Sequence, residues 1–353
     1  MSKENRATHI HTLSMHPEDE TISDPELGLG SRVRTILSVP KSIALDTGRY
    51  ELAGEHARGG LGRILHGRDV LLDRPVAVKQ LLREGDEAEA RFIREALITA
   101  RLQHPSIVPV HDLGRTPGGK PFYTMRMIPG RSLAEIIRQT QTLEQRLALL
   151  PHVIAVAHAM AYAHERRVIH RDLKPSNILI GPFGETVVVD WGLATDLDEA
   201  NRGSRPVSTA YEIAAAGLTV SGTVLGTPEY MPAEQAEGKS VDERADVYAI
   251  GAILYHLLAA APPHRGRNSR EVLANLVRFE PIPVEILEFG IPRELATIIR
   301  TAMARDPRDR YLTAKELAED LERFRTGQRI SAHPYSRGSL IWKWIIAWLR
   351  RGR

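Results

Sequence analysis

The chain has 353 residues, of which 42% are hydrophobic and 26% are charged, the composition of an ordinary globular protein. Its 47 basic and 44 acidic residues nearly cancel to a net charge of +3, a balance that argues against nucleic acid as a partner. Cysteine is absent, which excludes disulfides, thiolate metal sites and a cysteine nucleophile, and leads us to expect a reducing, cytoplasmic location.

The first 48 residues differ from the rest of the chain. They mix His, Ser, Pro and charge without sustained periodicity, so we expect residues 1–48 to form a mostly disordered extension, and they do not match a secretory signal. From Tyr50 the apolar runs have the length of strands. Residues 64–82 predict two strands joined by a turn, residues 86–103 an amphipathic helix, and residues 107–128 a second strand pair.

Beyond residue 130 the pattern is helical. The segments with helical periodicity are residues 131–139, 142–166, 245–260, 269–278, 293–304 and 314–327. A small strand-rich part, residues 49–127, therefore precedes a larger helical part, residues 128–327. We expect a cleft at the seam between them, and such clefts often bind ligands.

Residues 328–353 form a tail that contains the stretch SLIWKWIIAWLRRGR. Its apolar part, residues 340–349, is interrupted by Lys343 and is much shorter than the roughly 20 residues that span a bilayer. Its tryptophans and the basic residues 350–353 would suit peripheral contact with a membrane surface. A short amphipathic helix docked on the protein's own surface is the alternative, and we favour it.

A glycine-rich stretch, AGEHARGGLGRIL at residues 53–65, lies between strand-like segments. Glycine has no Cβ, so the backbone N–H groups around Gly59, Gly60 and Gly62 could close over phosphate groups. Taken alone, however, a glycine-rich hairpin is more common than a nucleotide-binding loop. A nucleotide-binding role needs support from motifs later in the chain.

Lys79 and Glu95 are expected to form an ion pair. Lys79 ends the run VAVK in a strand that is otherwise apolar, where an unpaired ammonium group is costly. Glu95 is the one carboxylate among inward-facing apolar residues of the next helix. A buried ion pair is poor evidence for stability, but it would hold an ammonium group where a phosphate must be gripped.

The segment VIHRDLKPSNILI, residues 168–180, places eight mostly polar residues between two short apolar runs. The apolar runs predict short buried strands. A charged loop that is anchored at both ends in the core is a typical place for catalytic groups, whereas the alternative is a solvated turn. The choice depends on whether the rest of the chain supplies matching groups.

Two apparent motifs are rejected on their details. GRTPGGK, residues 114–120, begins like a P-loop, but Pro121 replaces the Ser or Thr that would bind a metal, and a predicted strand comes next. His152, His158 and His164 lie six residues apart on one predicted helix, so successive rings point about 120° apart and cannot share a metal. We interpret these histidines as ordinary helix positions.

The order of the motifs resembles the protein kinase superfamily. A glycine loop, VAVK, a helix glutamate, HRDLKPSN and DWG at residues 190–192 succeed one another as in that superfamily. From about Arg49 to Gly327 the chain resembles bacterial kinases of the eukaryotic Ser/Thr type. The resemblance implies a bilobal α+β fold, with a small N-lobe (49–127) of antiparallel sheet plus one helix and a larger, mainly helical C-lobe (128–327).

The resemblance also implies transfer of the γ-phosphate of ATP to protein Ser and Thr hydroxyls, with Mg²⁺ or else Mn²⁺ as the metal. The implied catalytic residues are Asp172, Lys174, Lys79 and Glu95, and the implied metal ligands are Asn177 and Asp190. Asp172 would accept or orient the hydroxyl proton, and Lys174 would neutralise the γ-phosphate. One aspartate and one asparagine suffice for Mg²⁺, which prefers a few protein oxygens together with phosphates and water.

The nucleotide would be bound by both lobes, with Met125 at the gatekeeper position and Met127 in the hinge beside adenine. The implied nucleotide-binding residues are Ala57, Arg58, Gly59, Gly60, Gly62, Ile64, Ala77, Lys79, Met125, Met127 and Leu179. Ala57 departs from the family pattern because it replaces the first glycine of the loop. This replacement stiffens the loop.

Arg171, which precedes the catalytic aspartate, implies an enzyme that is switched by phosphorylation of its activation loop. A phosphate with a charge near −2 could pair with that arginine and order the loop. The candidate acceptors are Thr219, Ser221 and Thr223, and we expect at least one to be autophosphorylated, for which a transient homodimer is conceivable. Thr227, in GTPEY, occupies the place where Ser/Thr kinases form the substrate-side pocket.

Two structural roles are implied by the same resemblance. Glu234 and Arg310 would form a buried ion pair in the C-lobe, although PAE at residues 232–234 inverts the family's usual Ala-Pro-Glu order. Asp246 would hold the backbone of the catalytic loop. None of the departures from the family pattern removes a catalytic group.

Two other functions compete with a protein kinase. The first is a catalytically inactive, pseudokinase-type scaffold that binds partners or nucleotide without turnover; such proteins usually lack groups corresponding to Lys79, Asp172 or Asp190, all of which are present. The second is a small-molecule phosphotransferase of similar fold. The segments GTPEYMPAEQ and DERADVYAIG favour a protein substrate instead.

Overall fold

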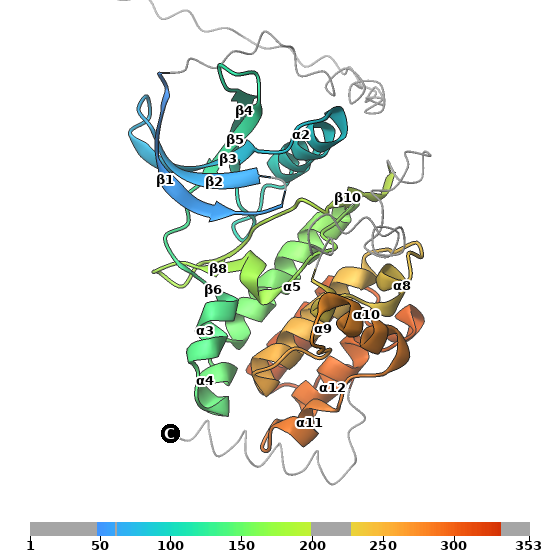
Figure 1. The fold of residues 1–353 in the computed structure, drawn as a ribbon. Helices are drawn as coiled ribbons and strands as arrows, with labels where there is room; N and C mark the ends of the chain where they lie inside the picture. Colours follow the sequence, from blue (N-terminus) through green and yellow to red (C-terminus); the bar gives the residue numbers. More distant parts are fainter. Residues whose placement is uncertain (1–47, 61, 199–226, 333–353) are drawn as a thin grey trace, which may run out of the picture. The chain divides into compact units, whose positions relative to one another are not determined.

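The first five long strands and one helix build the N-lobe. The computed structural model describes residues 48–60, 62–198 and 227–332 (Figure 1), so the expected disorder of residues 1–48 falls almost wholly outside the described residues. The elements of the N-lobe are β1 (Tyr50–Arg58), β2 (Gly62–Asp69), β3 (Arg74–Leu81), α2 (Asp86–Arg101), β4 (Val110–Arg115) and β5 (Pro121–Arg126). All neighbouring strands are antiparallel, in the order β1-β2-β3-β5-β4.

The C-lobe is mainly helical, as expected. Its helices are α3 (Leu133–Gln139), α4 (Leu143–Leu147), α5 (Leu150–Glu165), α8 (Ala233–Ala236), α9 (Arg244–Ala259), α10 (Ser269–Arg278), α11 (Val284–Leu287), α12 (Arg293–Ala302) and α13 (Ala314–Arg325). Its short strands are β6 (Arg131–Ser132), β7 (Val168–Ile169), β8 (Ile178–Ile180), β9 (Thr186–Val188) and β10 (Thr195–Asp196). Single turns of 3-10 helix lie at Pro175–Asn177, Pro228–Tyr230 and Pro307–Asp309. The predicted α+β class is confirmed.

The prediction of a single helix over residues 142–166 is wrong about continuity, because two helices, α4 and α5, occupy this segment. Thr142 and Gln145 form a reciprocal capping box at the start of α4. Pro151 stands in the first turn of α5, where its missing N–H costs nothing. In a continuous helix that N–H would have to reach the carbonyl of Leu147, so the proline divides the segment.

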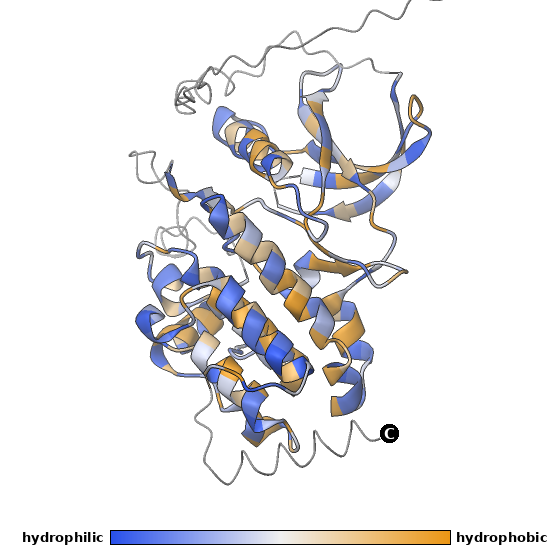
Figure 2. Cartoon of the chain, turned by 180° about the vertical axis from the view of Figure 1, so that it is seen from behind, coloured by the Kyte–Doolittle hydropathy of each residue, from blue (hydrophilic) through white to orange (hydrophobic). Residues whose placement is uncertain are grey.

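Helix α5 runs through the centre of the C-lobe and packs against α9 and α13. Residues 143–165 are long and apolar enough to cross a membrane by length and composition alone. Val153, Val156, Ala157 and Met160 are fully buried in the main hydrophobic core, which accounts for that apolar character without a membrane. The outer helices are mixed blue and orange in Figure 2, as expected for amphipathic helices with one buried face.

Candidate active site

Three side chains of the N-lobe form a hydrogen-bonded group. Nζ of Lys79, on β3, lies 2.5 Å from Oε1 of Glu95, on α2, so the expected ion pair is present. The hydroxyl of Tyr123, on β5, donates to the same carboxylate oxygen at 2.7 Å. Burial is the largest single influence and opposes ionisation of Lys79, but the surrounding groups, chiefly Glu95 and also Asp190, together outweigh it and raise the pKa of the ammonium group well above its ordinary value. Lys79 is therefore a fixed cation.

Asp190, in the C-lobe, faces this cation. Its Oδ1 lies 3.5 Å from Nζ of Lys79, although 110 residues separate the two in sequence and Asp190 remains half exposed. Burial opposes ionisation of Asp190 as well, yet the positive charges of Lys79 and Lys174 lower the pKa of its carboxyl group. Asp190 also has a positive φ of 64°, which few non-glycine residues adopt and which is typical of strained functional positions.

The catalytic-loop candidate connects β7 to β8 and brings four polar side chains together. Nζ of Lys174 donates to Oδ2 of Asp172 at 2.7 Å and to Oγ1 of Thr227 at 2.8 Å. The backbone N–H of Thr227 donates to Oδ1 of Asp172 at 3.3 Å. The amide nitrogen of Asn177 donates to the carbonyl oxygen of Asp172 at 3.0 Å, so its amide oxygen is left for another partner. Residues 172–177 are therefore a loop whose polar side chains bond to one another and to Thr227, and the alternative of a solvated turn is wrong.

His170 joins this loop to the segment that carries Asp190. Its Nδ1 accepts the backbone N–H of Asp172, and its ring lies 4.7 Å from that of buried Trp191. The backbone N–H of Val189 donates to the carbonyl oxygen of Asn177 at 2.9 Å. The two implied metal ligands, Asn177 and Asp190, are therefore held by directly bonded backbone segments.

Asp246, on α9, anchors the loop. Its fully buried carboxylate accepts the backbone N–H of His170 at 2.8 Å and of Arg171 at 2.9 Å, as the resemblance implied. Nε2 of His164 lies 2.9 Å from the same carboxylate. The interpretation of His164 as an ordinary helix position is therefore wrong, because its partner comes from a helix far along the chain. Nδ1 of His152 lies 2.8 Å from Oγ1 of Thr186.

The glycine-rich loop lies between β1 and β2. A Cβ on Gly62 would collide with the backbone carbonyl of Gln80, so close strand packing requires that glycine. Gly59 and Gly60 are different, because a Cβ on either would meet no protein atom closer than 3.9 Å. Packing within the described residues therefore accounts for Gly62 but not for Gly59 or Gly60.

The other implied nucleotide-binding residues occupy neighbouring positions of the sheet and of β8. Ala57 pairs with Ile64 across β1 and β2, Ile64 with Lys79 across β2 and β3, and Ala77 with Met125 across β3 and β5. Ala77 and Met125 are buried, and Ile64, Met127 and Leu179 are partly buried against the main core. Arg58 instead forms an exposed ion pair with Glu55 at 2.7 Å.

Arg171, the implied regulatory residue, is partly buried beside the catalytic-loop candidate. Its φ of 67° is positive, its Nη1 donates to Oγ1 of Thr195 at 3.0 Å, and its buried Nε has no partner in the described part of the chain. Burial is the main cause that lowers the pKa of its guanidinium group. Thr219, Ser221 and Thr223, the candidate phosphate acceptors, lie outside the described residues.

The end of the activation segment is held by the expected ion pair. Nη1 and Nη2 of Arg310 donate to the two carboxylate oxygens of Glu234 at 2.6 and 3.0 Å, so the inverted order of residues 232–234 leaves the pair intact. The next residue, Gln235, donates from Nε2 to the carbonyl oxygen of Arg171 at 2.8 Å. Helix α8 thus supports the catalytic loop directly.

Three residues of the site escaped the sequence analysis: Tyr123, His164 and Gln235. For Tyr123 a signal existed, because alternation along β5 places it on the same face as Met125, and in the structure Tyr123 is the strand partner of Lys79. His164 and Gln235 gave no local signal. Their partners are 82 and 64 residues away in the sequence, at positions that only the tertiary fold defines.

Lys79 of the antiparallel sheet is paired with Glu95 of α2 and faces Asp190, which follows β9 in the helical lobe beside the polar loop. This arrangement defines a phosphotransferase fold of the protein kinase class. Residues 50–333 match the protein kinase domain family, and the chain belongs to that family. Together with the bacterial relatives described next, this match confirms its recognition as a bacterial, eukaryotic-type kinase domain. Membership implies ATP and a divalent metal in general terms.

Curated relatives carry matching names. The chain is 36% identical over 287 residues to serine/threonine-protein kinase PknB of Mycobacterium tuberculosis, which covers 79% of this chain and 43% of the relative. It is 33% identical over 296 residues to serine/threonine-protein kinase PknD of Protochlamydia amoebophila, covering 79% and 30%. A probable serine/threonine-protein kinase of Corynebacterium efficiens is 37% identical over 284 residues, covering 78% and 41%. The chain thus spans less than half the length of each of these relatives.

Proposed function

We propose that the protein is a serine/threonine protein kinase that transfers the γ-phosphate of ATP to protein hydroxyls. The observation that carries this proposal is the approach of Lys79 to Asp190 at 3.5 Å, beside a loop in which Asp172, Lys174 and Thr227 are hydrogen-bonded together. These groups come from segments far apart in the sequence. A scaffold that binds without turnover would not need all of them in one place.

Asp172 acts on the attacking hydroxyl. Its carboxylate is oriented by Lys174 through Oδ2 and by the N–H of Thr227 through Oδ1, so the group is held in one rotamer while it accepts the hydroxyl proton. Lys174 spreads positive charge over the transferred phosphate. Such positioning and charge compensation supply most of the catalysis in phosphoryl transfer.

The residues present fit the nucleotide and a hard divalent ion. Lys79, held by Glu95, would bind the phosphates, and the open space at Gly60 would let the backbone approach them. The N–H of Gly59, in contrast, already donates to the carbonyl oxygen of Gly62 at 2.8 Å. The amide oxygen of Asn177 and the carboxylate of Asp190 are the oxygen donors that Mg²⁺ or Mn²⁺ accepts. When bound, the ion neutralises phosphate charge. The described residues contain no cluster of three His, Cys, Asp or Glu that could hold a metal ion.

Regulation is assigned to Arg171. Its unpartnered Nε would pair with a phosphate on Thr219, Ser221 or Thr223, added by a second copy of the chain in a transient dimer. Thr227, which bonds Lys174, is a poor acceptor because its hydroxyl is already engaged. A cytoplasmic location remains part of the proposal, supported only by the absence of cysteine.

The test is incubation of the full chain with γ-labelled ATP, Mg²⁺ and a generic protein substrate. Wild type is compared with Asp172→Asn, which removes the proton acceptor, and with Lys79→Met, which removes the cation. Glu165→Gln, an exposed change on α5, is the matched control. We expect label on Ser and Thr with wild type and the control only, together with a mass gain of at least one phosphate in the segment 199–226.

Two outcomes would count against the proposed activity. Nucleotide binding by wild type without any transfer would support the inactive scaffold. Transfer to small molecules but not to protein would support the other phosphotransferase. Full activity with no phosphate in the segment 199–226 would overturn the regulatory part alone.

A further inference from the structure

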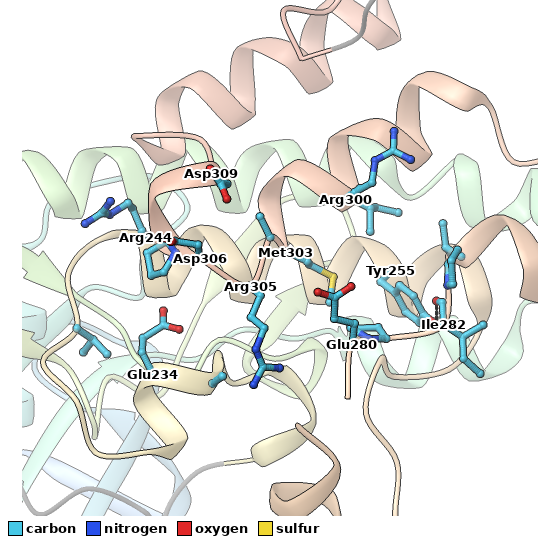
Figure 3. Close-up of a pocket in the computed structure, with 18 of the residues that line it drawn as sticks. Glu234, Arg244, Tyr255, Glu280, Ile282, Arg300, Met303, Arg305, Asp306 and Asp309 are labelled. Carbon is cyan, nitrogen blue, oxygen red and sulfur yellow. Dashed lines mark hydrogen bonds between the residues drawn. The ribbon is translucent and has the colours of Figure 1, made fainter. Parts of the chain in front are cut away.

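A large cavity of about 1200 Å³ lies in the C-lobe and contains none of the implied catalytic residues. Its walls come from α8 and the chain up to residue 242, from α9 and α12, and from the segments 280–285 and 303–309. In Figure 3, Ile282 and Tyr255 lie at one side and Glu234 and Arg244 at the other, with Met303 between them. Apolar and charged side chains both line it, which suits an amphipathic ligand.

One segment of the cavity wall, residues 280–285, belongs to a stretch of chain with exposed apolar side chains. The structure exposes eleven large apolar side chains among its described residues, and five of them fall within residues 279–289. These five are Phe279, Ile282, Ile286, Leu287 and Phe289. Exposed apolar residues scattered singly need no explanation, but a cluster of this kind marks an interaction surface. We call residues 279–289 the apolar ridge.

The apolar ridge also carries negative charge. Glu280 and Glu285 are exposed, line the cavity and form no ion pair within the described part of the chain. Glu288 is paired with Arg146 at 2.5 Å, so it is neutralised. Buried Val284, the first residue of α11, anchors the segment that carries these two free carboxylates. The two free carboxylates of the apolar ridge favour a partner that is apolar and basic, while the cavity wall also carries Lys239, Arg300 and Arg305.

We propose that the tail of this same chain, residues 340–349, docks on the apolar ridge and the cavity beside it. Residues 333–353 contain no acidic residue and five basic ones, and their apolar side chains include Trp342, Trp344 and Trp348. Large aromatic groups fill such cavities, and the basic residues oppose Glu280 and Glu285. This inference goes beyond the proposed function and does not depend on it.

The tail leaves the described structure from a helix that packs against one wall of the cavity. The backbone N–H of Ala332 donates to Oδ2 of Asp320, on α13, at 3.0 Å, and α13 packs against α12, which lines the cavity. Seven residues, 333–339, separate Ala332 from the docking segment and reach about 24 Å when extended. A tether of this length gives the tail an effective concentration in the millimolar range, so even weak contacts hold it on the surface.

The docked tail would lie against the support of the catalytic loop. Glu234 lines the cavity and holds Arg310, while the adjacent Gln235 bonds the carbonyl oxygen of Arg171. Filling the cavity would stabilise α8, and through it the loop that carries Asp172. Release of the tail would therefore affect the candidate active site through α8 and the catalytic loop.

Disulfide trapping in the full chain tests the proposal, because the chain has no cysteine of its own. Trp344→Cys is combined with Ile286→Cys on the apolar ridge or, as the matched control, with Glu319→Cys on α13. Glu319 is 44% exposed and adjoins Asp320, so an undocked tail would reach it easily. Under oxidised glutathione we expect the intramolecular disulfide at Ile286→Cys to form about tenfold faster than the control.

Charge reversal supplies the second arm. Adding Glu280→Lys and Glu285→Lys should slow trapping at Ile286→Cys about tenfold, as expected for loss of two exposed ion pairs, whereas Glu51→Lys and Glu165→Lys should not. Equal trapping at both positions, or no effect of the reversal, would overturn the proposal. So would intermolecular disulfides that vanish on dilution, which would indicate a second copy as the occupant.

Tryptophan fluorescence separates docking from membrane binding. Three of the four tryptophans lie in the tail, and the fourth, Trp191, is buried, so acrylamide quenching of the full chain reports the tail. Protection in buffer that is lost in the Glu280→Lys, Glu285→Lys variant supports docking. Protection that appears only after vesicles of phosphatidylglycerol are added would overturn it in favour of a membrane surface.

Discussion

His164 and Asp246 form a buried hydrogen bond, with Nε2 of the imidazole 2.9 Å from Oδ2 of the carboxylate. Burial opposes ionisation of Asp246, but the bonds from His164 and from the backbone of His170 hold the pKa of its carboxyl group below the ordinary value. A carboxylate that stays ionised can accept the N–H groups of both His170 and Arg171. This one buried anion therefore fixes the backbone that carries Asp172.

We expect Asp246→Asn to destabilise the protein and to lower its rate of phosphate transfer. An amide has one acceptor oxygen in place of two, so at least one N–H of His170 or Arg171 loses its partner. Each buried group left without a partner costs about 1–3 kcal/mol, and the free energy of unfolding should fall by about that amount. Urea denaturation followed by circular dichroism measures the loss, with exposed Asp309→Asn as the control. Equal stability of the two variants would contradict this role.

Tyr123→Phe should weaken the grip of Lys79 on ATP without unfolding the N-lobe. Burial is the main cause that raises the pKa of Tyr123 well above its ordinary value, so the hydroxyl stays protonated and donates to Glu95. Loss of this bond is worth about 1 kcal/mol, which is about fivefold in kcat/KM for ATP. Tyr255→Phe, which loses a similar bond to the carbonyl of Ile282, is the control. A full loss of activity, or none, would contradict a supporting role.

Thr227 provides a test of the substrate side of the site. Its hydroxyl accepts a bond from the charged Lys174, and such bonds contribute about 1.5–3 kcal/mol, so Thr227→Val should lower kcat/KM for a peptide substrate about tenfold or more. Thr227→Ser keeps the hydroxyl and should keep most of the activity. Steady-state rates at saturating ATP make the comparison. If Ser and Val behaved alike, the methyl packing of Thr227 and not its bond to Lys174 would be important.

Much of the site could be predicted because each motif combines local pattern with a chemical need. The run VAVK places a lysine in an otherwise apolar strand, and the next helix contains one inward-facing carboxylate. The pair of Lys79 and Glu95 could therefore be inferred from two short segments. The polar loop around Asp172 was likewise visible between its two apolar flanks. In both places a charged group must be paired or held in position, and the residues that create this requirement lie close together in the sequence.

The rest could not be predicted because it depends on contacts that only the assembled fold creates. His164 looked like any polar residue on a helix until α9 brought Asp246 beside it. Gly62 was grouped with Gly59 and Gly60 as a phosphate-binding glycine, whereas the close approach of β3 requires it. The division between α4 and α5 depends on Pro151, and a single proline does not change the periodicity of apolar residues from which the helix was predicted.

Two histidines of the C-lobe predict how stability depends on pH. Burial is the main cause that lowers the pKa of His256 and of His264 to about 4, and each imidazole lies against a tyrosine hydroxyl, that of Tyr230 at 2.5 Å and that of Tyr248 at 3.0 Å. Because the folded pKa lies below the unfolded value near 6.5, the unfolded chain takes up protons first as the pH falls. Stability is then complete above pH 6.5 and declines toward pH 4.

The size of this decline is about 3 kcal/mol for each histidine, since one pKa unit corresponds to about 1.4 kcal/mol. Urea unfolding measured at pH 7.5, and again at about pH 5, should show much of the loss in wild type. His256→Gln and His264→Gln cannot bind the proton, so each should flatten the profile, even if each is less stable at neutral pH. A wild-type profile that is flat over this range would mean that both imidazoles find room and solvent for their charge, which their close packing against Tyr230 and Tyr248 argues against.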